Sequence, residues 1–176
     1  MQLNPFNPYF GTLSGNSILE SYQNKKAQKL YNGILARRKK NRLRNLVKRG
    51  STELLNLALV IKSVCLGSRH YSGLRTVEIS KIRGSEDRSK DFDISFLPLL
   101  ENQRDRWQSV ATARLEAKPL PPVELVQVGD TYFVRDGHHR ISVAKALGEE
   151  FIEANIVAWN LCVPQDQAHP SLMGKS

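Results

Sequence analysis

Cysteine is scarce in this sequence. The two cysteines, Cys65 and Cys162, lie far apart and in no spacing that is typical of metal ligands. This argues against a disulfide framework and against a zinc site. Few and widely separated cysteines also fit a reducing cytosol, so we expect a cytoplasmic protein.

Long hydrophobic runs are also missing. The longest one, Leu54–Leu66, is interrupted by Asn56, Lys62 and Ser63, and it falls short of the roughly 20 apolar residues that span a bilayer. The N-terminus has neither a basic start nor an apolar core, so we expect no secretory signal there. We therefore expect no membrane partner, and 176 residues are most simply one domain with room for an additional element.

Acidic residues are nearly absent from residues 20–50. Eleven lysines and arginines stand there against one acid, Glu20, so this segment accounts for the whole net charge of +9. Such charge density can neutralise several phosphates, so we predict that the segment contacts DNA, with little base specificity. The predicted contact residues are Arg37, Arg38, Lys39, Lys40, Arg42 and Arg44. A solvated face, an acidic protein partner and RNA remain open alternatives.

The same N-terminal region has helical periodicity. Residues 1–18 are rich in Asn, Pro, Gly and Ser and are predicted to be irregular. Apolar residues at helical spacing predict one long helix, or two, up to Lys48, and Gly50 would end it. Ser51 can cap a second helix that runs to Gly67. Residues 19–67 are thus predicted to form a basic helical hairpin.

A different pattern follows from residue 74 onward. Short β-rich runs are predicted at 75–79, 123–128, 132–134 and 151–159, with helices at about 100–117 and 141–147. Gly129-Asp130 between the second and third runs is a strong hairpin signal. The fold class is therefore α/β or α+β, a compact body over residues 74–160 with a C-terminal tail at 161–176.

The segment Asp136-Gly137-His138-His139-Arg140 joins a predicted strand to a predicted helix. The first N–H groups of a helix have no internal partner and attract anions, and Gly137 keeps a side chain out of the approach path. Arg140 offers a planar fork of donors that suits phosphate oxygens. Asp136 could orient a histidine, hold Mg²⁺ on a phosphate or accept a proton. An ordinary turn with surface histidines is the simpler alternative.

These residues resemble the ParB/sulfiredoxin superfamily, in which a strand leads to a Gly-x-x-Arg turn and a short helix that ends near Leu-Gly. The matching positions are Gly137, Arg140, Leu147-Gly148 and the following Ile152–Val157. Upstream, Ile82–Arg88 resembles the first box of ParB N-terminal domains, and Leu120–Leu125 resembles the Pro-rich entry to the central strand. The resemblance covers about residues 74–159.

The resemblance implies a small mixed sheet with flanking helices whose turn holds the phosphates of CTP, ATP or ADP. Gly137, His138, His139 and Arg140 would cradle the phosphates, assisted by Gly84, Ser85 and Arg88 in the upstream loop. Nucleotide binding could then bias the basic arm or the formation of a homodimer. An alternative is a small kinase-like or nuclease-like enzyme, with Asp136 and His138 as its catalytic residues and Mg²⁺ as a cofactor.

The sequence also departs from the family. Where sulfiredoxins have their catalytic cysteine, this chain has His138. Without a thiol at that position the reductase chemistry has no nucleophile, so sulfiredoxin activity is not expected.

Overall fold

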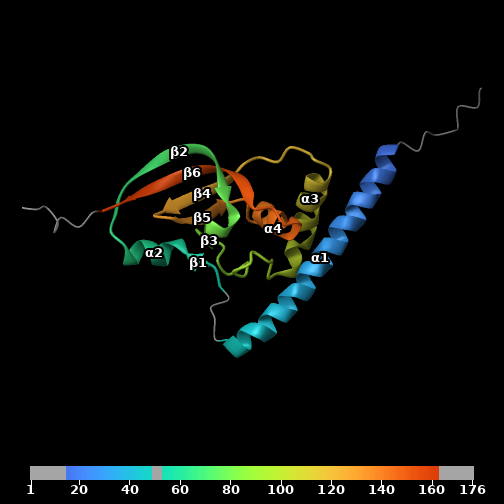
Figure 1. Cartoon of the computed structure of the whole chain (residues 1–176), viewed down its shortest axis with the longest axis horizontal. Coiled ribbons are helices and arrows are strands. Elements are labelled where there is room, and N and C mark those ends of the chain that lie inside the picture. The colour runs from blue at the N-terminus through green and yellow to red at the C-terminus, as the bar shows by residue number, and fades with distance from the viewer. Residues whose placement is uncertain (1–14, 49–52, 163–176) are drawn as a thin grey trace, which may run out of the picture.

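The computed structural model describes residues 15–48 and 53–162, and it contains one mixed sheet with helices on both sides (Figure 1). The α-helices are α1 Gly15–Lys48, α2 Leu57–Ser63, α3 Arg104–Leu115 and α4 His138–Leu147. The strands are β1 Leu55–Asn56, β2 Leu66–Glu78, β3 Ile82–Ser85, β4 Val123–Val128, β5 Thr131–Asp136 and β6 Phe151–Leu161. Two short 3₁₀ helices, Ile79–Lys81 and Glu101–Gln103, precede β3 and α3. The predicted mixed α/β class is confirmed.

The sheet order is β1-β3-β5-β4-β6-β2. Strands β4 and β5 pair in antiparallel fashion across the Gly129 turn, and β2 pairs antiparallel with β6 at one edge. The pairs β1/β3, β3/β5 and β4/β6 are parallel. Because β3 and β5 are parallel neighbours, their carboxyl ends meet at the same edge of the sheet, which positions the site described below.

Three apolar clusters hold these layers together. The first lies between the sheet and α4 and includes Phe92, Phe96, Val134 and Ile141. The second packs α1 on α3 and α4 through Ala27, Tyr31, Ile34, Trp107 and Val143. The third covers the opposite face of the sheet with α2 through Leu57, Val126 and Phe133.

The first predicted helix is confirmed as the single helix α1, although α1 begins at Gly15, inside the segment 1–18 that was predicted to be irregular. The predicted helical hairpin is wrong. Residues 53–56 enter β-bridges instead, since Glu53 bridges Asp93 and β1 pairs with β3. Helix α2 begins only at Leu57, where Oδ1 of Asn56 accepts from the N–H groups of Ala58 and Leu59 at 2.9 and 3.3 Å. Helix α2 therefore packs on the sheet and forms no hairpin with α1, and the predicted cap Ser51 lies outside the described residues.

Residues Gly67–Gly73, which lie between the predicted hairpin and the predicted body, are part of the long edge strand β2. Its pairing with β6 places Cys65 beside Cys162, with 5.3 Å between their Cα atoms, and the two form a disulfide. The N–H of Cys162 also donates to the carbonyl of Cys65 at 3.0 Å. The inference from cysteine spacing was therefore wrong, because strand pairing closes a sequence separation of 97 residues. The cysteine content therefore no longer supports the expectation of a reducing compartment.

None of the helices in the described ranges is both long and apolar enough to cross a membrane.

Candidate functional site

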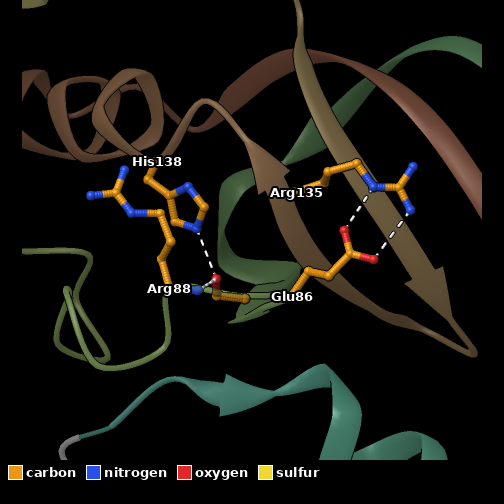
Figure 2. A network of polar contacts seen from close by, with 5 residues as sticks. Glu86, Arg88, Arg135 and His138 are labelled. Atoms are coloured by element: carbon orange, nitrogen blue, oxygen red, sulfur yellow. Dashed lines mark hydrogen bonds and ion pairs between the residues drawn. The ribbon is translucent and has the colours of Figure 1, made fainter.

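The two segments with predicted phosphate ligands lie side by side at the carboxyl ends of β3 and β5. Ser85 is in register with Val134, and the N–H of Glu86 donates to the carbonyl of Val134 at 2.9 Å. The loop after β3 therefore faces the turn after β5, as Figure 2 shows for Arg88 and His138. The structure thus brings together the upstream loop and the turn that the sequence treats as separate candidates.

Gly137 occupies the position before α4 with φ +98°, in the left-handed region. An added Cβ would lie 2.6 Å from Cγ1 of Val123, so a side chain is excluded on both conformational and steric grounds. Its carbonyl accepts the first helical bond, from the N–H of Ile141 at 3.0 Å. The predicted requirement for glycine at this turn is confirmed.

His138 points into the protein, where Nε2 lies 2.8 Å from Oγ of Ser85 (Figure 2). The same Oγ accepts from the N–H of Arg88 at 2.9 Å, and the imidazole stacks on Phe92. Burial, followed by the nearby charges of Arg88 and His139, lowers the pKa of His138 to about 4. The ring is therefore neutral at pH 7. Because Ser85 is fully buried, the Ser85–His138 pair is not an accessible nucleophile.

His139 is also buried, with 5% of its surface exposed, and its ring contacts Phe92 edge-on. Burial lowers its pKa to about 4, and the charges of Arg88 and Arg106 act in the same direction. The ring is therefore neutral at pH 7. Within the described part of the chain, Nδ1 of His139 has no hydrogen-bond partner.

Arg106 was not predicted as a site residue. It lies on α3, and nothing in its local sequence distinguishes it from Arg104, two residues earlier. Only the packing of α3 on α4 brings its charge close to His139. The sequence also did not reveal the ion pair between Arg135 and Glu86, whose Nε and Oε2 atoms lie 2.7 Å apart next to the site (Figure 2).

Arg88 lies where the sequence predicted, beside the turn. Its Nε donates to Oδ2 of Asp91 at 2.7 Å, and its guanidinium lies 5.4 Å from the centre of the Phe92 ring. The Arg88 side chain is 37% exposed, so it lies at the protein surface beside the two buried histidines. Arg88 is therefore a partly exposed cation beside the turn.

Arg140 does not present its donors to a ligand. Its guanidinium donates to the carbonyls of Pro121 and Pro122 at 2.5 and 2.7 Å and to Oδ2 of Asp136 at 2.5 Å. The Arg140 side chain is only 14% exposed. The predicted phosphate-binding orientation of Arg140 is therefore wrong for this structure. The predicted role of Asp136 as a histidine-orienting group is also wrong, because Asp136 pairs with Arg140.

Gly84 has a structural reason to be glycine. An added Cβ would lie 2.3 Å from Cδ1 of Phe133 and 2.7 Å from the carbonyl oxygen of Leu55. Strands β1 and β5 thus leave no space for a side chain here. Gly84 was expected to assist in holding the phosphates. In the structure it is packed closely between neighbouring strands of the sheet.

The predicted nucleic-acid contacts lie on α1, and they divide into three groups. Arg37, Lys39 and Lys40 are exposed. Arg38 is half-buried and donates to the carbonyls of Pro98 and Leu99 at 3.1 and 3.2 Å, so it attaches α1 to the body and is not a free cation. The side chains of Arg42 and Arg44 lie outside the described residues.

Metal ligands do not gather at the site. In residues 15–48 and 53–162, no group of three or more His, Cys, Asp or Glu side chains is placed to hold a metal ion.

The fold and site together define a mixed α/β protein whose histidine turn is folded inward and whose cationic helix lies on the outside. No family model matches the sequence, and no curated protein matches it significantly. Among solved structures, the chain is similar to sulfiredoxin from Arabidopsis thaliana, with 19% identity over 47% of this chain and 82% of that chain, and a TM-score of 0.37.

Proposed function

We propose that this protein binds nucleic acid through the exposed face of α1. The observation that carries the proposal is the set of exposed cations on this helix, with no acidic residue between the first and the last. These cations are Lys25, Lys26, Lys29, Arg37, Lys39 and Lys40. Because α1 also packs on α3 and α4 through its apolar side chains, the helix that carries the cations is held in place on the body.

A rigid cationic helix suits a polyphosphate backbone better than it suits specific bases. Each phosphate contact releases counterions, so about six contacts on duplex DNA would give a slope of log affinity against log salt of about −5. Contacts of this kind set position and carry little sequence information. We therefore expect similar affinities for duplexes of unrelated sequence.

Fluorescence anisotropy with duplex DNA and duplex RNA between 50 and 200 mM salt tests this proposal. The triple variant Arg37→Gln, Lys39→Gln, Lys40→Gln should bind more weakly and reduce the slope by about 2 to 3. A control variant replaces three exposed lysines outside α1 by glutamine: Lys62, Lys81 and Lys90. Equal losses in the two variants, or no binding by the native protein, would refute a role for α1.

We propose a second function, phosphate binding at the β3/β5 junction, on the strength of Arg88, whose partly exposed side chain lies beside the turn that opens α4. The first-turn N–H groups of α4, together with Arg88 and Arg106, add positive potential. The ligand class is a nucleotide such as CTP, ATP or ADP, with or without Mg²⁺. In this proposal Arg140 stabilises the turn and does not contact the phosphates.

Calorimetric titration with CTP, ATP and ADP, with and without Mg²⁺, tests this second proposal. Arg88→Gln and Arg106→Gln should each weaken binding, whereas Arg83→Gln, at an exposed position on β3, should not. Binding without turnover favours a nucleotide-dependent switch, and light scattering would then show whether the nucleotide changes the oligomeric state. Turnover that Asp136→Asn or His138→Gln abolishes favours the enzyme alternative, and absence of binding refutes the proposal.

A further inference from the structure

A groove runs along α1 on the side that faces α4. Its main part has a volume of about 690 Å³, and its lining extends from Tyr22 to Arg37 and includes Ala146 of α4. A second hollow of about 240 Å³, towards Leu97, shares the lining residues Ile34, Arg37 and Ala146 with the first. The two hollows therefore form one continuous groove, hereafter the α1/α4 groove. Figure 1 shows α1 crossing the α3 and α4 side of the body.

Gly33 lies near the middle of α1 and lines the α1/α4 groove. Glycine in a helix interior is destabilising relative to alanine, so a reason for its presence is needed. The fold does not supply one, since an added Cβ at Gly33 would meet no atom within 4 Å. What the missing side chain does provide is an open stretch of helix backbone at the centre of the groove.

The lining of the α1/α4 groove has an apolar floor and cationic walls. Leu30, Ile34 and Ala146 contribute the floor, which Ile94 and Leu97 continue in the second hollow. The walls carry Lys25, Lys26, Lys29, Arg37 and Lys145. No aspartate or glutamate lines either hollow, so the groove is complementary to a ligand that is apolar on one side and acidic at its margins.

We infer that the α1/α4 groove binds an acidic amphipathic α-helix of another protein. From Tyr22 to Arg37 the groove follows 16 residues of α1, a rise of about 22 Å at about 1.5 Å per step, which matches a partner helix of about four turns. The apolar stripe of that helix would lie on Leu30 and Ile34 and cross α1 at Gly33, where the absent side chain allows close approach of the two backbones. Its acidic residues would pair with the lysines on the walls.

This chain does not carry a segment of that chemistry. Helix α3 has three arginines and one aspartate, and α4 has no acidic residue. Outside the described ranges, residues 1–14 contain no acid, and residues 163–176 contain Asp166 and Lys175, whose charges cancel. Since the described helices of this chain lack that chemistry, the inference commits to a different protein as the occupant.

Nucleic acid would use the same lysines but would make different demands on the groove. A duplex binds a cationic surface through its phosphates, and this binding requires neither an apolar floor nor a glycine inside the helix. Gly33 is thus the position where the two kinds of ligand can be separated. Filling the groove at Gly33 changes its shape and leaves every charge of α1 in place.

The test uses fluorescence anisotropy on the full chain with three labelled probes. The first probe is a synthetic 16-residue peptide, stapled as a helix, with leucines on one face and glutamates on both flanks of that face. The second has the same composition and staple in a scrambled order that lacks the apolar face, and the third is a duplex DNA. The variants are Gly33→Leu, which fills the groove, and Gly33→Ala, which adds only one methyl group.

The native protein should bind the amphipathic peptide at least tenfold more tightly than the scrambled one. Gly33→Leu should weaken peptide binding at least tenfold and leave DNA binding within twofold, while Gly33→Ala should have an intermediate effect on the peptide. Circular dichroism and the thermal midpoint of both variants establish that α1 is intact, and both midpoints should equal or exceed that of the native chain.

Equal binding of the amphipathic and scrambled peptides would overturn the inference, because the cations alone would then explain the interaction. Unchanged peptide binding by Gly33→Leu would also overturn it. Loss of DNA binding in Gly33→Leu would identify nucleic acid as the occupant of the groove instead. If DNA does not bind at all, the proposed nucleic-acid binding by α1 is refuted, and the peptide comparison alone then decides whether the groove binds an amphipathic helix.

Discussion

Arg140 and Asp136 form an ion pair across the first turn of α4, with Nη2 and Oδ2 2.5 Å apart. The same guanidinium also holds the carbonyls of Pro121 and Pro122. One side chain thus joins the start of α4 to the segment that leads into β4. The residue that most resembles a phosphate ligand in the sequence is, in the folded protein, a connector between two parts of the backbone.

Replacement of Arg140 by glutamine should therefore lower stability. Hydrogen bonds to a charged group contribute about 1.5 to 3 kcal/mol, so we expect a loss of this order in the free energy of unfolding from urea denaturation. Arg140→Lys should recover part of it, since one ammonium can reach some but not all of the three acceptors. Unchanged stability in Arg140→Gln would argue that the guanidinium is free for a ligand after all.

Stability should decrease on acidification because His138 and His139 are buried as neutral rings. The pKa of each is lowered to about 4 in the folded chain, from 6.5 in the unfolded chain. Their contribution is complete above pH 6.5 and is lost as the pH falls towards 4, where the unfolded state binds more protons. Each histidine should lower the free energy of unfolding by up to about 1.4 kcal/mol per pH unit in that range.

Urea denaturation at pH 7, 6 and 5, followed by the fluorescence of buried Trp107, checks this prediction. The variant His139→Phe removes one of the two groups and should flatten the pH dependence by about half. If the native chain were equally stable at pH 7 and pH 5, the inward placement of the histidines would be contradicted.

Reduction of the bond between Cys65 and Cys162 should destabilise the protein. The two residues are separated by 97 positions, and a cross-link over such a loop stabilises by about 4.7 kcal/mol in the chain-entropy model. A reducing agent should lower the thermal midpoint of the native protein and leave that of the double variant Cys65→Ser, Cys162→Ser unchanged. Two free thiols in the untreated native protein, detected by mass-resolved alkylation, would show that the bond does not form.

Two glycines should respond in opposite ways to substitution by alanine. Gly33→Ala adds a methyl group in open space on a helix and should stabilise by about 0.5 to 1 kcal/mol. Gly84→Ala would place its Cβ 2.3 Å from the Phe133 ring and should destabilise by about 1 to 3 kcal/mol. Thermal denaturation of both variants measures the difference. Destabilisation by Gly33→Ala would indicate that α1 packs more tightly there than the structure describes.

Much of the fold could be predicted because it depends on neighbouring residues. The helical spacing of apolar residues predicted α1 and α4, and the Gly129 turn predicted the β4/β5 hairpin. Gly137 and Gly148 both adopt positive φ at the two ends of α4, where strand-to-helix and helix-to-strand turns require it. Backbone angles and side-chain periodicity are local properties, so the local sequence is sufficient to specify them.

The candidate site could be predicted only in its residue types. The parallel pairing of β3 and β5 decided that Ser85 would bond to His138, and the packing of α3 on α4 decided that Arg106 would lie near His139. Arg38 was indistinguishable in sequence from its neighbours on α1, and only the segment at Pro98–Leu99 turned it into a structural contact. Each of these outcomes depends on a partner far away in the chain.

The sequence by itself determined that this protein has a mixed α/β body, a long cationic helix and a glycine-dependent turn before α4. Composition, periodicity and the conformational freedom of glycine are present in the chain before it folds. Tertiary structure alone decided that Cys65 meets Cys162, that Arg140 binds the proline carbonyls, and that both histidines are buried and neutral. Those properties arise from which strands become neighbours and which groups lose water, and neither can be read from spacing along the chain.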